Sequence, residues 1–175
     1  MDVTLRPLTR DDLILLGAWL REPVVQEWWH EDDAPEALEH RYGAAIDGRD
    51  PTALRIGLVD GAPAGFVQWY RLADEPEYVA ELAPFVPIPA DAWSLDYLVG
   101  DAALRRRGVG TAFVRAALAE IGAAPVVVPV HARNPGSAGV LRGAGFRLAA
   151  EAQLEPDNPA HSRDHLVFVR AALSA

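Results

Sequence analysis

The alternation of apolar and polar positions predicts a strand at Val3–Pro7 and then a helix. Thr9 precedes two aspartates, as a helix cap does, and apolar residues recur at helical spacing after it. Pro23 restarts the chain into an apolar run that ends in two tryptophans, and residues 34–46 have the pattern of a second helix with acids on its exposed face. We expect these two helices to lie side by side.

The clearest local pattern is a hairpin. Residues 54–59 and 62–70 are two strand-like runs around Asp60-Gly61, a pair that accepts the positive φ angles of a type I′ turn. Residues 71–91 follow, rich in acids and prolines and without periodicity. Because this segment is longer than a usual connection, we interpret it as a functional insertion or lid.

The second half of the chain alternates strands with two further helices. The expected elements are a strand at 93–99, an amphipathic helix at 108–121, a strand at 125–130, a helix capped by Asn134-Pro135 that stops at Gly143 or Gly145, and an antiparallel pair at 146–152 and 166–169 around Asp157-Asn158-Pro159. No repeat or linker divides the chain, so we expect one domain over residues 1–175.

Composition narrows the class of protein. The 175 residues are 50% hydrophobic and 23% charged, which is typical of a globular domain and not of a disordered chain. No apolar run approaches the roughly 20 residues of a membrane span. The start carries no export leader, so we expect a cytoplasmic protein. The absence of cysteine excludes a disulfide framework, a zinc ribbon and a cysteine nucleophile.

The charge balance favours a cationic ligand over an anionic one. Twenty-five acidic residues against sixteen basic ones give a formal charge of −9, the wrong sign for attracting nucleic acid or anionic lipid. The acids of interest lie in two segments: Glu31, Asp32 and Asp33, and Asp74, Glu75, Glu77 and Glu81. They form a negative funnel if both segments overhang the site, and are otherwise solvated loops that keep the protein dispersed.

The most distinctive motif lies between an expected strand and an expected helix. It reads Arg105-Arg106-Arg107-Gly108-Val109-Gly110-Thr111. Glycines let the backbone approach a ligand, the helix start offers free N–H groups, and arginines add charged donors, so the loop predicts a pyrophosphate site. Packing alone also places glycines at helix starts. The loop lacks the Gly-Lys-Ser/Thr of a Walker motif and the spacing and acid of a dinucleotide fingerprint.

Asp96 is the candidate base. It is a carboxylate in an otherwise apolar strand, where desolvation is costly unless something satisfies it. A carboxylate held in such a place can act as a base or proton relay for a bound group that must lose a proton. The alternative is a structural hydrogen bond to a bulge or loop.

In this order of elements, the sequence resembles the GNAT superfamily of N-acetyltransferases over nearly the whole chain. The fold implied is α/β (α+β), with a mixed, mostly antiparallel central sheet flanked by helices and splayed between its fourth and fifth strands. Within the superfamily it resembles the aminoglycoside 6′-N-acetyltransferases. The motifs that carry this resemblance are Val3-Thr4-Leu5-Arg6, Glu27-Trp28-Trp29, Asp60-Gly61-Ala62-Pro63 with Gly65, Gln68-Trp69-Tyr70, Leu95-Asp96, and Gly108-Val109-Gly110-Thr111 with Val114-Arg115-Ala116.

The resemblance implies a ternary site for acetyl-CoA and a small cationic amine. The pyrophosphate of acetyl-CoA would lie on Arg106 to Thr111, its pantetheine between splayed strands at Leu98 and Val126, and Asn134 near the thioester. Asp96 would sit by the amine as its base. The walls of the sugar pocket would be Trp28, Trp29, Gln68 and Tyr70. Since adjacent helical residues cannot face the same way, we expect one tryptophan to stack on the sugar and the other to join the helices.

This chain departs from the family pattern at the leaving-group side. The family places a tyrosine general acid on the helix after the asparagine, where this chain has Leu141, and an aspartate before that helix, where it has Pro129 and Val130. A free thiol has a pKa of about 8.5, so its anion can leave without a strong acid. We therefore expect a slower enzyme or a different arrangement.

Several readings of the function stay open at this point. The leading one is acetylation of an aminoglycoside 6′-amine, which is antibiotic resistance. The others are acyl transfer to a siderophore precursor or other metabolite amine, and a non-catalytic acyl-CoA binding module. His131 could assist proton transfer or be a plain loop residue; His161 and His165 have metal-like spacing but lack a third ligand, so we expect no metal. The chain could be a monomer or a homodimer.

Overall fold

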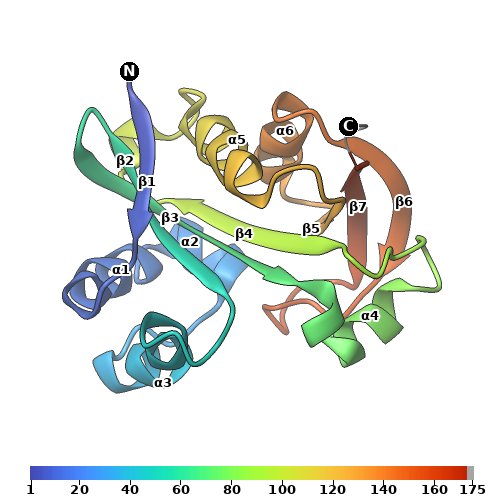
Figure 1. Ribbon diagram of the computed structural model, residues 1–175, viewed down its shortest axis with the longest axis horizontal. Coiled ribbons are helices and arrows are strands. Elements are labelled where there is room, and N and C mark those ends of the chain that lie inside the picture. The colour runs from blue at the N-terminus through green and yellow to red at the C-terminus, as the bar shows by residue number, and fades with distance from the viewer. Residues whose placement is uncertain (173–175) are drawn as a thin grey trace.

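The computed structural model describes residues 1–172 (Figure 1). The first half contains β1 (Val3–Pro7), α1 (Leu13–Leu20), α2 (Pro23–Trp29), α3 (Pro35–Ile46), β2 (Ala53–Val59), β3 (Ala62–Arg71) and α4 (Pro76–Leu82). The second half contains β4 (Trp93–Val99), α5 (Val109–Ile121), β5 (Val126–His131), α6 (Pro135–Gly143), β6 (Arg147–Gln153) and β7 (Asp164–Arg170). Single 3-10 turns lie at Arg10–Asp12, Leu72–Asp74 and Ala102–Leu104.

The strands form one seven-stranded sheet in the order β1-β2-β3-β4-β5-β7-β6. Every neighbouring pair is antiparallel except β4 and β5, which are parallel and are joined through α5. This confirms the expected mixed, mostly antiparallel α/β architecture. A parallel pair requires a crossover, and the amphipathic helix between the two strands supplies it.

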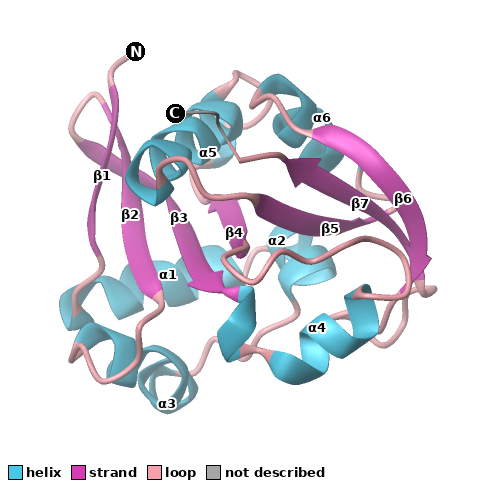
Figure 2. Ribbon diagram, turned by 45° about the vertical axis from the view of Figure 1, so that its right-hand side comes forward, coloured by secondary structure: helices cyan, strands magenta, loops and turns pink. Residues whose placement is uncertain are grey.

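Helices cover both faces of the sheet (Figure 2). On one face, α5 and α6 bury Phe113, Val114 and Leu141 against the strands. On the other face, α1 and α3 lie side by side and bury Leu16 and Tyr42 against β2 and β3. The helix α4 covers the β5–β7 half of that second face, where a separate apolar cluster forms around Leu72, Leu82, Val86, Val127 and Val167.

The predicted hairpin is confirmed. Asp60 and Gly61 have φ angles of 50° and 82°, as a type I′ turn requires, and β2 and β3 pair directly across them. The ladder continues from β3 to β4, so that Gln68 lies opposite Asp96. The hairpin therefore sets the position of the candidate base.

The sheet splits between β4 and β5, as expected. The ladder between them consists of one pair, Trp93 with Val126, beside a backbone hydrogen bond of 2.9 Å from Trp93 N to Pro125 O. We expected Leu98 and Val126 to flank the cofactor together where the two strands splay, and the strand register shows that this was wrong. Val126 lies where the strands still touch, and a count of five residues along each strand from that pair brings Leu98 level with His131, at the open end.

Two segments differ from the sequence-based expectation. The run before the tryptophan pair is itself a helix, α2, because Pro23 takes its first position and fixes a helical φ. The acid- and proline-rich segment expected to lack periodicity contains α4, begun by Pro76 in the same way. Leu72 and Leu82 from this segment are fully buried, so much of it is part of the core.

Across residues 1–172, no helix combines the length and the apolar character needed to cross a membrane.

Candidate active site

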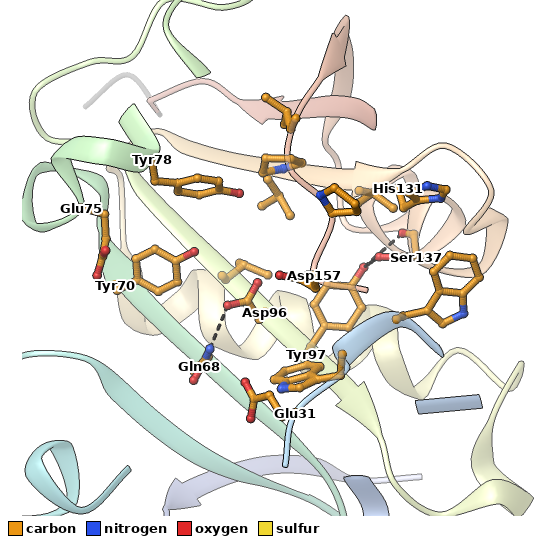
Figure 3. A pocket seen from close by; sticks show the side chains of 18 of the residues that line it. Glu31, Gln68, Tyr70, Glu75, Tyr78, Asp96, Tyr97, His131, Ser137 and Asp157 are labelled. Carbon is orange, nitrogen blue, oxygen red and sulfur yellow. Dashed lines mark hydrogen bonds between the residues drawn. The ribbon is translucent and has the colours of Figure 1, made fainter. Parts of the chain in front are cut away.

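A cavity of about 500 Å³ opens at the split between β4 and β5 (Figure 3). It is lined by α2 with the residues after it and α3, by strands β2 to β5, by the segment around α4, by the start of α6, and by the loop between β6 and β7. Segments far apart in the chain thus converge on the one place where the sheet has no continuous ladder.

The cavity reaches both faces of the sheet. Successive residues of a strand point to opposite faces. On β4, Tyr97 packs with the α5 and α6 cluster, whereas Leu98 packs with the α1 and α3 cluster, which puts Asp96 on this second face beside Gln68. Because Asp96 and Tyr97 both line the cavity, it must pass through the split from one face to the other.

Asp96 is the most strongly perturbed carboxylate of the cavity. Burial raises its pKa from the ordinary 3.8 to about 6, an amide hydrogen bond of 2.9 Å from Gln68 lowers it, and the negative charge of Asp157 raises it. A carboxylate with this pKa is mostly ionised at pH 7 and still able to take up a proton. The alternative of a hydrogen bond to a bulge or loop is not observed: Gln68 belongs to the regular β3–β4 ladder.

Acidic side chains outnumber basic ones in the lining of the cavity. Its carboxylates are Glu31, Asp50, Glu75, Asp96, Glu155 and Asp157, against the single arginine Arg41 within residues 1–172. Burial raises the pKa of Glu31 and of Asp157. Glu31 is held by Tyr42 Oη at 2.6 Å and by Arg41 Nε at 2.7 Å. The remaining carboxylates leave the cavity with an excess of negative charge.

The expected funnel forms in part. Of the acids named from the sequence, Glu31 and Glu75 line the cavity. The others lie elsewhere: Asp33 pairs with Arg21 at 2.6 Å, and Asp32 accepts a hydrogen bond from the backbone of Ala34. Asp74, Glu77 and Glu81 are outside the lining too. Their place is taken by Asp157 and Glu155 from the β6–β7 loop.

The four expected wall residues all line the cavity. The Trp29 ring packs edge-on against Phe66 with centroids 5.9 Å apart, which ties α2 to the sheet. The Trp28 ring faces two histidine rings, 5.6 Å from His131 and 5.0 Å from His161. Gln68 and Tyr70 follow each other on the same face of β3.

The histidines beside Trp28 form a cluster with His165. The rings of His131 and His165 contact the backbone, whereas Nε2 of His161 lies 3.9 Å from the carboxylate of Glu27. His131 accepts a 3.2 Å hydrogen bond at Nδ1 from Arg133 N and lies 3.0 Å from Ser162 O at Nε2, which fits a neutral ring that donates from Nε2. Burial lowers the pKa of His165. Among the described residues, no group of three His, Asp or Glu side chains is arranged to hold a metal ion.

The loop before α5 has the geometry of an anion site. Arg106 and Gly108 take positive φ angles of 61° and 85°, which turn the chain into the helix start. A Cβ added at Gly108 would meet nothing within 4 Å, so its backbone is open to a ligand. The first turn of a helix leaves its N–H groups without intrahelical partners, and Arg106 and Arg107 extend into solvent beside them. Gly110 lies against Val140 of α6, where a Cβ would come within 3.1 Å.

Arg105 differs from its two neighbours. Its guanidinium donates to the carbonyl oxygens of Val99 and Gly100, both at 2.9 Å, and pairs with Glu22 at 2.5 Å. Arg105 therefore attaches the end of β4, and the loop that follows it, to the residue before α2. Arg106 and Arg107 are the two exposed arginines of the motif.

The start of α6 borders the split. Asn134 caps this helix, accepting a 3.0 Å hydrogen bond at Oδ1 from Ser137 N, as the sequence predicted. Tyr97 reaches across from β4, with its hydroxyl 2.6 Å from Ser137 Oγ and 3.1 Å from Ser137 O. Leu141 is fully buried in the apolar cluster under α6 and does not line the cavity.

Comparison with known proteins identifies the family. The model of the acetyltransferase (GNAT) domain matches residues 9–154, most of the chain. The chain belongs to the GNAT acetyltransferase family. Acetyltransferases of this family take their acetyl group from acetyl-CoA.

Curated relatives and solved structures resemble this GNAT domain closely in fold and less in sequence. Aminoglycoside N(6′)-acetyltransferase type 1 of Klebsiella pneumoniae is 29% identical over 119 residues, which are 65% of this chain and 56% of that protein. The chain thus matches little more than half the length of this curated relative. The aminoglycoside acetyltransferase AAC(6′)-Ib in complex with coenzyme A has a TM-score of 0.78 at 20% identity, covering 97% of this chain and 95% of that one. Mycobacterium smegmatis RimJ in complex with CoA-disulfide has a TM-score of 0.73 at 18% identity, covering 96% and 81%.

Among the cavity residues of this GNAT domain that the sequence did not reveal are Asp157, Tyr78 and Tyr97. Asp157 was seen as part of a turn, because nothing in a short Asp-Asn-Pro run reveals that the loop folds back over β4. Tyr78 lay in a segment thought to lack periodicity. Tyr97 follows Asp96 directly and so belongs to the other face of a strand; its role depends on the split, which the residues themselves do not signal.

Proposed function

We propose that this GNAT domain transfers the acetyl group of acetyl-CoA to a primary amine of a small cationic aminosugar, the 6′-amine of an aminoglycoside being the leading candidate. The observation that carries the proposal is the acidic cavity, which opens to both faces of the sheet and holds Asp96 among further carboxylates. A polyamine or aminosugar is attracted to such a cavity, and bulk anions are repelled.

The donor side follows from the loop and the split. The N–H groups at the start of α5, with Arg106 and Arg107, bind the pyrophosphate. The pantetheine arm passes along the backbone of β4 at Leu98, whose side chain packs on the other face and does not line the cavity, on the way to Asn134 and the thioester. Beyond Trp93, the edge of β4 that faces β5 has no strand partner, so its N–H groups are free to polarise the thioester carbonyl.

The acceptor side follows from Asp96 and the walls. Asp96 removes a proton from the bound ammonium, and the neutral amine then attacks the thioester carbon. Trp28, Trp29, Gln68 and Tyr70 line the space in which an aminosugar is oriented, while Asp157 and Glu75 contact its further ammonium groups. The amine and the thioester enter the split from its two sides and meet within it, which supplies the proximity that the reaction needs.

The decisive experiment is thiol release from acetyl-CoA by the purified protein. The panel comprises kanamycin- and gentamicin-type aminoglycosides, matched compounds with a 6′-hydroxyl, polyamines, lysine derivatives and an N-terminal peptide. Turnover that requires the 6′-amine supports the proposal. Turnover with only a metabolite amine replaces the aminoglycoside by that acceptor, and silence across the panel with acetyl-CoA still bound overturns the proposal.

A further inference from the structure

Acetyl transfer to an amine produces a thiolate, and the cavity must accommodate it. When the tetrahedral intermediate collapses, the C–S bond breaks and its electron pair leaves on sulfur. Asp96 already holds the proton taken from the ammonium, so the proton that the nitrogen must still lose is released to solvent. On the face of Asp96, the charged side chains of the cavity are carboxylates apart from Arg41, and this excess of negative charge repels a thiolate. The sulfur is therefore better placed on the opposite face.

The donor reaches the split from that opposite face. The loop before α5 and the start of α6 both lie on it, since α5 and α6 pack against the same side of the sheet. The cavity lining there consists of apolar side chains of β4 and β5 and of three residues with proton donors: Tyr97, Asn134 and Ser137. Asn134 is committed to capping α6.

We infer that the hydroxyl of Tyr97 donates a hydrogen bond to the departing CoA thiolate, with Ser137 as the residue that positions it (Figure 3). The Tyr97 hydroxyl lies at the split, between the base on the one side and the start of α6 on the other. Ser137 Oγ, 2.6 Å away, can donate to the oxygen of Tyr97. The tyrosine proton is directed at the carbonyl oxygen of Ser137 at 3.1 Å and can turn from there toward sulfur. This inference rests on the proposed acetyl transfer.

The pKa values of the CoA thiol and of the Tyr97 hydroxyl decide whether the tyrosine donates a hydrogen bond or transfers its proton to sulfur. A thiol has a pKa of about 8.5 and a free tyrosine about 10, and burial raises the pKa of Tyr97 further. Full transfer of the proton from Tyr97 to sulfur is thus unfavourable. The tyrosine keeps its proton, stabilises the anion by a charge-assisted hydrogen bond, and the thiolate takes its proton from solvent after release.

Two consecutive residues of β4 thus act on the two reacting groups of the acetyl transfer. Asp96 faces the amine and Tyr97 faces the sulfur because neighbouring side chains on a strand point to opposite faces. Elsewhere in the sheet such a pair is separated by the ladder to the next strand. Here the missing ladder between β4 and β5 lets one cavity include both.

The test measures the acidity of the thiol of bound CoA. The complex of protein and CoA is titrated, and the thiolate is followed by its ultraviolet absorbance. A hydrogen bond to the anion lowers the thiol pKa below about 8.5. We expect Tyr97→Phe to raise the thiol pKa of bound CoA by about one unit and to lower kcat about tenfold or more, with the KM for acetyl-CoA little changed.

Two further variants make the result specific. Tyr70→Phe removes the same hydroxyl from a tyrosine on the other face, and the thiol pKa should stay at its wild-type value. Ser137→Ala keeps the carbonyl partner of Tyr97 at 3.1 Å and should produce a smaller rise of the thiol pKa, which keeps the test open if Tyr97→Phe fails to fold.

The outcomes separate this inference from the proposed function. An unchanged thiol pKa in Tyr97→Phe, with kcat also unchanged, overturns the role of Tyr97. A wild-type protein that acetylates no aminoglycoside overturns the proposed acceptor, and the thiol titration still decides the role of Tyr97 because it requires no acceptor.

Discussion

The side-chain amide of Gln68 donates a 2.9 Å hydrogen bond to the carboxylate of Asp96, its direct partner across β3 and β4. A donor to the ionised form lowers the pKa of that carboxylate, so this contact opposes the burial that raises it to about 6. The ladder thus sets both the place and the acidity of the candidate base.

Gln68→Leu should move the acidic limb of the pH profile upward. The change removes the donor and adds apolar surface, and both effects raise the pKa of Asp96 above about 6. The limb to follow is that of kcat/KM for the acceptor, which falls as pH drops through the pKa of the base. A limb at the wild-type pH or below it would contradict the assignment of Asp96 as base.

Asp157→Asn should move the same limb in the opposite direction. The negative charge of Asp157 raises the pKa of Asp96, so its removal lowers that pKa. The KM for a polycationic acceptor should rise about threefold to tenfold, because a cavity carboxylate is lost. Asp91→Asn, which makes the same charge change at an exposed site outside the cavity, is the matched control. Equal effects of the two variants would mean that only net charge matters.

Asp96→Asn should reduce turnover by about a hundredfold or more while acetyl-CoA affinity is kept. The comparison of kcat with the dissociation constant for acetyl-CoA, from calorimetry, separates the two. A non-catalytic acyl-CoA binding module predicts no turnover in either protein.

The same substitution should change the pH dependence of stability. The folded state holds the proton of Asp96 with a pKa of about 6 against an ordinary 3.8, so its contribution to stability is present below about pH 4 and is lost as pH rises through 6. Asp96→Asn removes this loss. The free energy of unfolding of the variant, relative to wild type, should therefore be higher at pH 8 than at pH 4 by on the order of 1–3 kcal/mol. A constant difference across that range in denaturant titrations would show that Asp96 does not titrate in this way.

The three arginines before α5 should separate into two classes. Arg105→Ala should destabilise the fold by about 1–3 kcal/mol, because it leaves the carbonyls of Val99 and Gly100 and the carboxylate of Glu22 without their donor. Arg106→Ala and Arg107→Ala should leave the melting temperature unchanged and raise the dissociation constant for CoA about threefold to tenfold each, more at low salt. A melting temperature of Arg105→Ala equal to wild type would refute the structural half of this division.

Gly57→Ala should loosen α5 from the sheet. The ring of Phe113 on α5 lies over Gly57 and Gly65, and a Cβ at Gly57 would approach that ring to 2.4 Å. We expect a loss of about 1–3 kcal/mol of stability from this overpacking. Gly61→Ala is a different case, because its Cβ meets nothing and only the positive φ of 82° is strained. A second substitution, Phe113→Leu, should recover part of the loss in Gly57→Ala but none in Gly61→Ala.

Much of the fold could be predicted because its signals are local. The Asp-Gly turn, the apolar alternation of residues 93–99, the glycines at the start of α5 and the Asn134-Pro135 cap act within a few residues, and they placed the hairpin, β4, α5 and α6 close to where they lie. Asp96 could be singled out for a local reason too, as a charge in an apolar strand.

The rest depends on contacts between distant segments. The β6–β7 loop brings Asp157 to Asp96, and the register of one strand pair decides that His131, and not Val126, is level with Leu98. The role of Arg105 depends on Glu22, 83 residues earlier in the chain. Residues that act through such partners have no periodicity or motif that reveals them.

The single pair between Trp93 and Val126 leaves the molecule as two half-sheets joined at one rung. Beyond that pair, the backbone donors and acceptors of β4 and β5 that face each other stay available in the folded chain, whereas in a continuous sheet they would be paired in the ladder. A ligand with amide groups that occupies the gap can form the backbone hydrogen bonds that the two strands do not form with each other. Its binding free energy then adds to the stability of the whole chain, and the two halves are held together most firmly while the ligand is present.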